Sequence, residues 1–357
     1  MELFVKQELN PDEIIEWSEL WMGCSKSHAQ QHYLHAGVEV AKGRKPLFLY
    51  GKNKGRIVAI GIFSIKPIYG TMKYSLEAYC LRGPVFEDIH CGIEFLYKAK
   101  LYFNSNKVGQ IRISPHWHNQ QAKELIEALK NNGFSPYYKK QDSLSTTGIV
   151  NLQDVEISNL IATFSKSARR EISRAERQHV EIRPITQVSE SLKFIKELNS
   201  MLITQRLTPT SESEFVGLFN LLLKKGDLGI LLGAYKEKLF LGGLLLYRDC
   251  NYAHGYRFVV AKNLLAEISN LRLAPIIWFH AMTWAKGKGC HWLDLEGYDI
   301  IKDKTNRLYN IYKYKSEFNP TLSKRVSEHI QVCNYTTYLF YRFFTIISKI
   351  KRKLLMK

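Results

Sequence analysis

The sequence contains one lysine, Lys315, whose neighbours could hold its positive charge in a fixed position. Lys315 lies in the segment Tyr314–Asn319, between aromatic residues, at the end of an expected helix and just before an expected strand. A lysine flanked by aromatic rings can be held partly out of water with its ammonium directed into a cleft, where it would stabilise the negative charge that develops in acyl transfer. The alternative is a surface lysine on an amphipathic helix, because Leu308, Ile311, Tyr312 and Lys315 fall at helical spacing.

Four further residues fit a site of this kind. Asp294 falls in the expected strand His291–Leu295, close to its end, and would orient an attacking amine or accept its proton. Its alternative role is a helix cap or a salt bridge. Tyr256 and Arg257 lie on the strand before a long helix and would line the cleft, unless they belong to the core. Arg206 follows a helix and would bind a phosphate or a carboxylate, with an ordinary surface arginine as the alternative.

The net charge of +18 implies an anionic partner, and nucleic acid, anionic lipid headgroups and phosphorylated small molecules all qualify. Cations repeat along one expected helix at spacings that place several on one side: Lys166, Arg169, Arg170, Arg174 and Arg177. This pattern suits the phosphates of an RNA such as tRNA. The alternative is a solvated helix face without a partner.

Residues 331–357 carry a second basic feature. Six cations and no acidic residue follow Gln331. The apolar and basic positions recur at helical spacing on opposite sides: Phe340, Phe343, Phe344, Ile347, Ile350 and Leu354 against Arg342, Lys349 and Lys353. This predicts a basic amphipathic helix that lies on an anionic membrane surface. The alternative is a helix docked on the protein's own core.

Composition excludes several classes of protein. A chain of 357 residues with 45% hydrophobic residues is expected to form two folded domains. The six cysteines include no CxxC pair, and His116 and His118 lack a third ligand at a telling spacing, so no metal site is expected. Neither a signal peptide nor a membrane-spanning stretch is evident, which favours a cytoplasmic protein attached peripherally to the inner membrane face.

Hydrophobic periodicity predicts the same order of elements twice, each half mixing antiparallel strands with helices. The first half is expected to hold a helix starting at Asn10–Pro11, strands Pro46–Tyr50, Arg56–Ile65 and Lys73–Arg82, helix Ile93–Asn104, strand Gly109–Ser114, helix Gln120–Asn132 and strand Thr147–Leu152. The second is expected to hold the basic helix Ile157–Gln178, strand Val180–Pro184, helices near Leu192–Leu202 and Glu214–Lys225, strands Gly229–Tyr235, Leu239–Tyr247 and Tyr252–Val260, helix Leu271–Lys288 and strand His291–Leu295. We therefore predict a duplicated α/β (α+β) domain over residues 1–150 and 151–330, followed by the 331–357 helix.

Several strings in this order resemble the Fem family of peptidyltransferases. They span about residues 79–326 and are Tyr79–Val85, Ile111–Pro115, Gly133–Phe134 with Gln141 and Thr147–Leu152, the basic string Ala168–Val180, and the set Leu273–Gly289, Leu293–Gly297 and Tyr314–Asn319. The resemblance implies two tandem GNAT-like (acetyltransferase-like) domains, with mostly antiparallel mixed sheets flanked by helices. It also implies aminoacyl-tRNA as donor and a peptidoglycan precursor as acceptor. Arg82 and Tyr314, which lie within these strings, are then expected to contact substrate.

The chain departs from the family pattern at three places. The usual FKxxFG string is Tyr314–Asn319 here, the usual DLGG string is Asp294–Gly297, and the acidic residue that often follows the IR-x segment is Ser114. Related double-domain proteins include acyltransferases thought to use acyl-CoA, so that donor stays open. However, residues 259–271 contain no glycine, and the pyrophosphate-binding loop of acetyl-CoA enzymes would need glycines there.

The expected function is therefore transfer of an amino acid from aminoacyl-tRNA to an amine of a peptidoglycan or other cell-envelope precursor, lipid-linked or nucleotide-linked, without a cofactor. An alternative is an acyl-CoA-dependent N-acyltransferase that acts on a cell-envelope sugar or lipid. A third hypothesis, from another class, is a non-catalytic RNA- or membrane-binding protein that has kept the fold.

Overall fold

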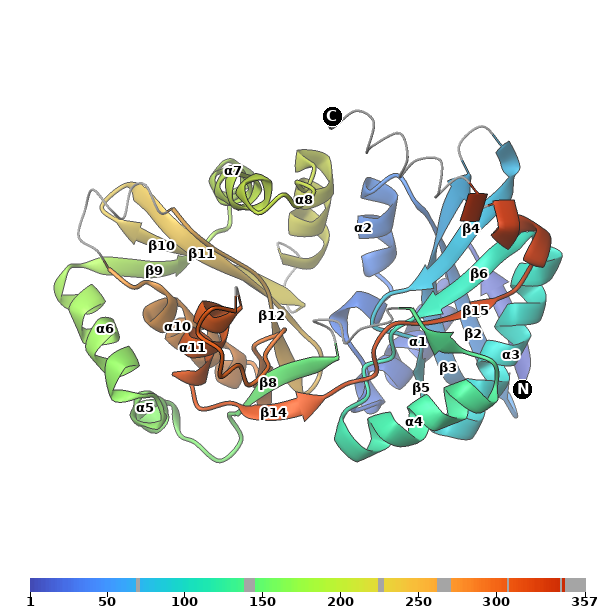
Figure 1. Ribbon diagram of the computed structural model, residues 1–357, viewed down its shortest axis with the longest axis horizontal. Helices are drawn as coiled ribbons and strands as arrows, with labels where there is room; N and C mark the ends of the chain where they lie inside the picture. The colour runs from blue at the N-terminus through green and yellow to red at the C-terminus, as the bar shows by residue number, and fades with distance from the viewer. Residues whose placement is uncertain are drawn as a thin grey trace. The chain divides into compact units, whose positions relative to one another are not determined.

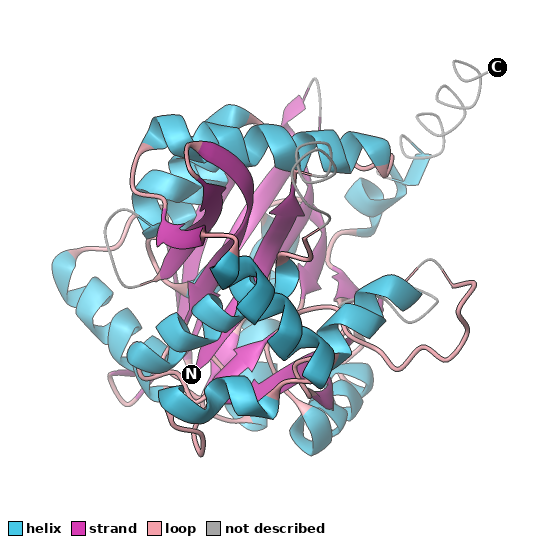
Figure 2. Cartoon of the chain, turned by 90° about the vertical axis from the view of Figure 1, so that its left-hand side faces the viewer, coloured by secondary structure: helices cyan, strands magenta, loops and turns pink. Residues whose placement is uncertain are grey.

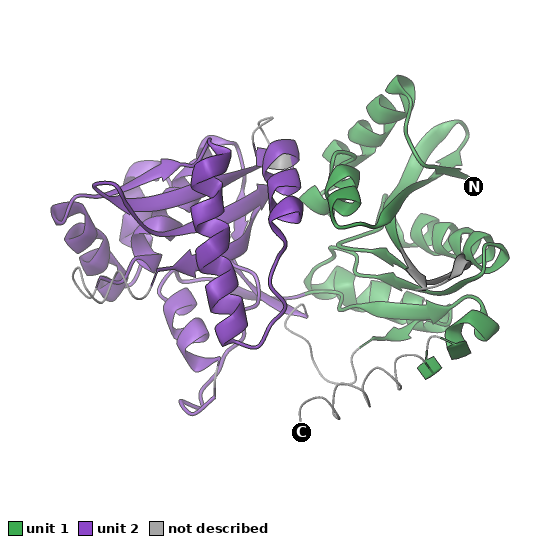
Figure 3. Ribbon diagram, turned by 90° about the horizontal axis from the view of Figure 1, so that it is seen from above, with its two compact units in different colours: residues 1–142, 325–357 green, residues 143–324 purple. Residues whose placement is uncertain are grey.

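Two units make up the chain (Figures 1 and 3). The computed structural model describes residues 1–68, 71–137, 145–223, 228–261, 271–306, 308–340 and 342–343. Unit 1 comprises residues 1–142 and 325–357, and unit 2 comprises residues 143–324. Each unit is built around one mixed sheet flanked by helices, so the predicted α/β class is confirmed (Figure 2).

The sheet of unit 1 follows the order β1-β2-β3-β4-β6-β15-β7, with β5 paired to β3. Its neighbours are antiparallel except β4 and β6, which run parallel. The strands are β1 (Glu2–Lys6), β2 (Lys45–Asn53), β3 (Arg56–Ile68), β4 (Thr71–Cys80), β5 (Val85–Phe86), β6 (Val108–Ile113), β7 (Ser135–Pro136) and β15 (His329–Val332). The helices are α1 (Pro11–Gly23), η1 (Ala29–Gln31), α2 (His35–Ala41), α3 (Ile89–Ser105) and α4 (Asn119–Asn131).

Helices pack on both faces of this sheet, because alternate strand residues point to opposite faces. Phe63 of β3 packs on Phe103 of α3 with ring centroids 5.2 Å apart, whereas Phe48 of β2 packs on Trp17 of α1 at 5.4 Å. The predicted start of α1 is confirmed by a capping box, in which the Asn10 side chain accepts from the backbone N–H of Glu13 and the Glu13 side chain accepts from that of Asn10, both at 2.9 Å.

The sheet of unit 2 follows the order β14-β8-β13-β12-β11-β10-β9. Here β12 and β13 run parallel, and the other neighbours are antiparallel. The strands are β8 (Thr146–Asn151), β9 (Val180–Pro184), β10 (Gly229–Lys236), β11 (Leu239–Arg248), β12 (Tyr252–Val260), β13 (Trp292–Asp294) and β14 (Thr321–Lys324). The helices are α5 (Ile157–Leu160), η2 (Ile161–Thr163), α6 (Lys166–Arg177), α7 (Val188–Thr204), α8 (Glu212–Leu218), η3 (Phe219–Leu223), α10 (Ala274–Gly287) and α11 (Tyr309–Ser316).

The predicted duplication is visible in the two parallel pairs. In unit 1 helix α3 connects β4 to β6, and in unit 2 helix α10 connects β12 to β13. Helices α7 and α8 lie on one face of the unit 2 sheet, and α6, α10 and α11 lie on the other (Figure 1). The core of unit 2 forms around α10, whose Trp278, Ala281 and Met282 are buried.

The domain boundaries differ from the predicted ones at both ends of unit 2. Strand β8, expected to complete the first domain, pairs antiparallel with β13 and β14 and so belongs to the sheet of unit 2. Strand β15, which the sequence analysis did not predict, pairs with β6 and β7 in unit 1. The units are therefore bounded differently from the predicted domains 1–150 and 151–330, because periodicity identifies a strand without identifying its partners.

The predicted helix Ile157–Gln178 is interrupted. Phe164 is buried between η2 and α6, and the hydroxyl of Ser165 accepts from the N–H of Ala168 at 3.1 Å to cap α6. The basic segment is therefore a separate helix with its own N-terminus.

The C-terminal segment is described only in part. Residues 335–340 and 342–343 are helical, as predicted, and expose Tyr335, Leu339, Phe340 and Phe343. The remaining positions of the predicted amphipathic helix lie outside the described residues. Across the part of the chain that the structure describes, none of the helices is both long and apolar enough to cross a bilayer.

Candidate active site

The carboxyl end of β13 holds the first residue of the candidate site. Asp294 ends this strand, where the pairing of β13 with β12 also stops at the His254–Asp294 pair. Its side chain is fully buried, and one carboxylate oxygen accepts from the hydroxyl of Thr147 on β8 and from the N–H of Glu296 at 2.7 Å. Asp294 therefore fixes the turn that follows its own strand, as an aspartate commonly does.

Lys315 meets the same turn. It lies in the last turn of α11, and its ammonium donates to the backbone carbonyls of Glu296 and, at 3.1 Å, of Gly297. Only 7% of the residue is exposed. Glu296 and Gly297 both have positive φ angles, 53° and 43°, which aim successive carbonyls at one cation. The structure thus brings the two predicted catalytic residues, Asp294 and Lys315, to one turn in unit 2.

The aromatic neighbours of Lys315 hold its helix against the core. Tyr314 stacks on Phe258 of β12 with centroids 6.1 Å apart, and burial raises the pKa of its hydroxyl. Phe318 is buried between Phe164 and Trp278. The residues on both sides of the lysine therefore pack into the core of unit 2, while Lys315 itself is buried.

A histidine that sequence reasoning missed also contacts Asp294. His254 of β12 lies with Nε2 2.8 Å from Oδ2 of Asp249 and with Nδ1 3.8 Å from Oδ2 of Asp294. Burial disfavours its charged form, but the hydrogen bond to Asp249 and the nearby carboxylate of Asp294 outweigh burial and raise its pKa to about 9. The available signal was a histidine between two small residues, Ala253 and Gly255, in an expected strand.

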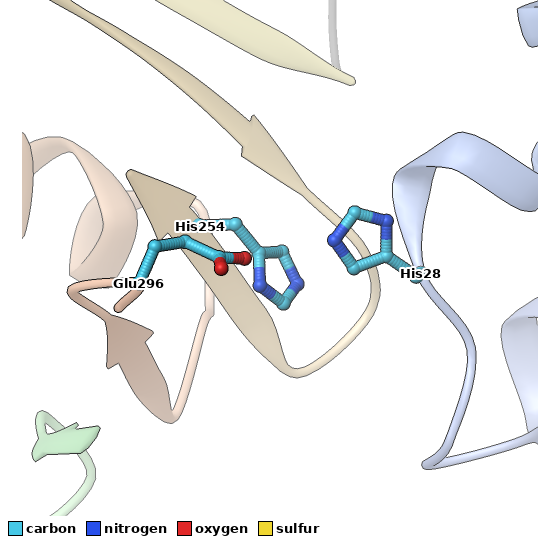
Figure 4. Close-up of side chains that lie close together, drawn as sticks. All are labelled: His28, His254 and Glu296. Carbon is cyan, nitrogen blue, oxygen red and sulfur yellow. The ribbon is translucent and has the colours of Figure 1, made fainter. Parts of the chain in front are cut away.

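Figure 4 shows His254 projecting from β12 and Glu296 projecting from the turn after β13, with the two side chains close together. A carboxylate oxygen of Glu296 lies within 4.8 Å of a ring nitrogen of His254. His254 therefore faces carboxylates from β13, from the turn after β13 and from the β11–β12 turn.

Tyr256 and Arg257 lie farther along β12, at a bulge. Leu245 of β11 pairs with Arg257 and Leu246 pairs with Gly255, so Tyr256 is the extra residue. The Arg257 guanidinium stacks over the Tyr256 ring at 4.3 Å, and both side chains are partly exposed. These two predicted substrate-binding residues are thus on the strand of His254, beyond the end of its pairing with β13.

The other two predicted substrate-binding arginines belong to different units, Arg206 to unit 2 and Arg82 to unit 1. Arg206 is exposed just beyond α7, with a φ of 57° and its N–H bonded to the carbonyl of Ile203 at 2.9 Å. Among the described residues, no hydrogen bond or ion pair joins Arg206 to Asp294 or Lys315. Arg82 belongs to unit 1, where it is buried at the end of β4 with its N–H bonded to the Ser114 hydroxyl at 2.8 Å.

The predicted RNA-binding helix α6 turns its cations outward. Ala168, Ile172 and Ala175 are buried against the core, and this orients the opposite face toward solvent. That face carries a surface depression of about 460 Å³, lined by Lys166, Arg169, Arg170, Ser173, Glu176 and Arg177. Four cations and one carboxylate line the depression, which suits an anion. Arg174, the fifth predicted residue, is half-buried and does not line it.

Helix α6 is joined to the helix of Lys315. The N–H of Ser165, the cap of α6, donates to the carbonyl of Glu317 at 2.8 Å. Arg272 bonds the Glu317 carboxylate at 2.6 Å and the Ser167 hydroxyl of α6 at 3.0 Å. The basic helix therefore begins beside the residues that directly follow Lys315.

Comparison with known proteins supports the fold. No protein-family profile matches the chain, and no curated protein matches its sequence. The fold is similar to that of FemX, with a TM-score of 0.78 and 15% identity over 95% of this chain and 99% of that one.

Two further solved structures match with lower scores. They are the C-terminal domain of a putative lysylphosphatidylglycerol synthetase from Agrobacterium fabrum (TM-score 0.56, 12% identity, 95% and 98% of the two chains) and a tandem GNAT protein from the clavulanic acid biosynthesis pathway (TM-score 0.55, 10% identity, 93% and 99%). The chain therefore has a Fem-like double GNAT fold, as the sequence strings predicted.

Proposed function

We propose that this protein is an aminoacyltransferase that moves an amino acid from aminoacyl-tRNA to an amine of a peptidoglycan or other cell-envelope precursor. The observation that carries the proposal is the turn after β13, whose carbonyls hold the buried ammonium of Lys315 and whose Glu296 N–H bonds Asp294. The names of two fold relatives, FemX and a putative lysylphosphatidylglycerol synthetase, support a transferase of aminoacyl groups.

The chemistry requires stabilisation of one negative charge. The acceptor amine attacks the ester carbonyl, the carbonyl oxygen becomes an oxyanion, and the tetrahedral intermediate collapses to an amide. The tRNA hydroxyl then leaves with the proton that the amine has lost. A cation already fixed by protein carbonyls needs no reorganisation when the oxyanion forms, and this is the role assigned to Lys315.

Asp294 has a different role in this scheme from the one its sequence position suggested. Its side chain is fully buried and is engaged by Thr147, by the N–H of Glu296 and by His254. A carboxylate held in this way orients the turn that binds Lys315. We therefore assign Asp294 to positioning and not to proton abstraction from the amine.

The donor assignment depends on α6. Its exposed cations form a site for phosphates, and its cap is bonded to Glu317, two residues after Lys315. A tRNA whose backbone lies along α6 would therefore have a phosphate-binding surface that starts next to the proposed catalytic helix. Arg257 and Tyr256 on β12 are the proposed contacts to the acceptor or to the aminoacyl group.

The acceptor would be reached at a membrane surface. Tyr335, Leu339, Phe340 and Phe343 expose between 54% and 72% of their surface on the short C-terminal helix, and six cations follow Gln331 in the sequence. Apolar side chains together with cations favour peripheral binding to anionic lipid. This would place a cytoplasmic enzyme next to lipid-linked precursors.

The donor can be tested without knowing the acceptor. The protein is incubated with a mixture of charged tRNAs, or with a mixture of acyl-CoAs, together with nucleotide-linked and lipid-linked envelope precursors, and mass spectrometry detects modified products. We expect an aminoacyl mass increase only with charged tRNA. Acylation only from acyl-CoA would favour the N-acyltransferase alternative, and tight RNA or liposome binding without turnover would favour a non-catalytic protein.

A further inference from the structure

Four buried side chains form a row of neighbouring residues within the sheet of unit 2. They come from the β11–β12 turn, β12, β13 and β8, and they are Asp249, His254, Asp294 and Thr147. His254 bonds Asp249 at 2.8 Å, lies 3.8 Å from Asp294, and Asp294 accepts from Thr147. Each residue is at most 2% exposed. The last carboxylate of the row fixes the turn whose carbonyls hold Lys315.

The far end of the row is anchored to backbone. The other oxygen of Asp249 accepts from the N–H groups of Asn251 at 2.9 Å and Tyr252 at 2.7 Å. Asp249 is therefore fixed by its own turn, and it in turn fixes the ring of His254. The Tyr252 ring, which stacks on the histidine at 5.8 Å, leaves the imidazole little room to rotate.

Burying three charged groups side by side costs free energy that a purely structural core would avoid. Two buried carboxylates repel each other unless a cation lies between them, and well-packed apolar residues commonly stabilise a core as well as a buried ion pair does. The imidazolium of His254 is the cation that lies between Asp249 and Asp294. The row of four buried side chains also ends at the proposed catalytic turn, which a purely structural role would not require.

We propose that His254, held by Asp249, is a positioning residue that acts through Asp294 to fix the turn carrying the Glu296 and Gly297 carbonyls, and so fixes the ammonium of Lys315. This inference rests on the proposed aminoacyl transfer for its catalytic consequence. Its structural consequence, an ordered Lys315 ammonium, does not depend on which donor the protein uses.

The test uses three variants of the full chain. His254→Gln and Asp249→Asn remove the charged pair while keeping polar side chains of similar size. His280→Gln is the matched control, because His280 is a half-buried histidine of α10. The first readout is the 15N NMR signal of the Lys315 ammonium, assigned by its loss in Lys315→Met. Slow hydrogen exchange reports that the ammonium is held by its carbonyls.

We expect a protected Lys315 signal in the wild type and in His280→Gln, and loss of protection in His254→Gln and Asp249→Asn. Far-UV circular dichroism identifies any variant that does not fold, and the other variant then decides. An unchanged Lys315 signal in a folded His254→Gln or Asp249→Asn variant would overturn the proposal.

The second readout is kinetic. We measure kcat and KM for aminoacyl transfer in the wild type and in each variant. In His254→Gln and Asp249→Asn we expect kcat to fall about 10- to 100-fold below the wild-type value with KM changed less than about 3-fold, because ground-state binding is kept while the transition-state cation is displaced. His280→Gln should keep the wild-type kcat and KM. The wild-type kcat should also fall as the pH rises through about 9, where His254 loses its proton, and this fall should be absent in His254→Gln. If the wild type transfers no amino acid, the proposed function fails, but the NMR result still decides the positioning role.

Discussion

Reversing two charges on α6, Arg170→Glu together with Arg177→Glu, tests whether this helix binds RNA. Four exposed cations line the depression on α6, including these two. If each neutralises one phosphate, the logarithm of the binding constant should fall with the logarithm of salt concentration with a slope of about −3 to −4, or about 100-fold between 50 and 200 mM. The variant keeps two of the contacts, so its slope should be about −1.5 to −2 and its loss about 10-fold.

Fluorescence anisotropy with labelled tRNA over a KCl series measures both slopes. The control is Lys193→Glu with Lys196→Glu, which makes the same change in net charge on exposed positions of α7, on the opposite face of the unit 2 sheet. The control pair should leave the slope close to that of the wild type. An α6 variant with the wild-type slope, or a control pair that lowers the slope equally, would refute the assignment of this helix to RNA binding.

Three further predictions concern other parts of the structure. Folding raises the pKa of His254 from about 6.5 to about 9. The contribution of His254 to the free energy of unfolding should therefore be complete below about pH 6.5, and about 3 kcal/mol of it should be lost as the pH rises through 9. Urea denaturation at each pH measures this loss, which should be absent in His254→Gln. Thr147→Val removes the hydroxyl that donates to Asp294 and should lower the free energy of unfolding by about 1–3 kcal/mol, whereas Thr147→Ser should recover most of it; equal stabilities would contradict the hydrogen bond. Leu339→Ser with Phe343→Ser should reduce sedimentation with anionic liposomes while leaving transfer to a water-soluble acceptor intact, and unchanged sedimentation would rule out this contact with lipid.

The features of the site that are local in sequence could be predicted. Lys315 was identified by the aromatic residues beside it, and these same residues pack against Phe258 and Trp278 to hold its helix. Asp294 was identified by its place at a strand end. The cations of α6 were identified by their spacing, because helical periodicity needs no knowledge of distant contacts.

The partners of these residues could not be predicted, because they depend on pairing between distant strands. Thr147 reaches Asp294 only because β8 crosses into the second sheet, and the two residues are 147 positions apart. Because of the same crossing, unit 2 begins at Ser143 and not at the predicted residue 151. Asp249 and His254 are close in sequence, but their value to the site depends on the parallel pairing of β12 with β13, which no local pattern reveals.

Single-turnover transfer from isotopically labelled aminoacyl-tRNA by Lys315→Met, compared with Lys313→Met, tests most directly whether Lys315 is the catalytic cation. Lys313 lies on the same helix and is exposed, so its variant controls for loss of charge and for handling. We expect Lys315→Met to react about 10²- to 10³-fold more slowly than the wild type, and Lys313→Met to react at close to the wild-type rate. A folded Lys315→Met protein that transfers amino acid as fast as Lys313→Met would contradict the proposed mechanism.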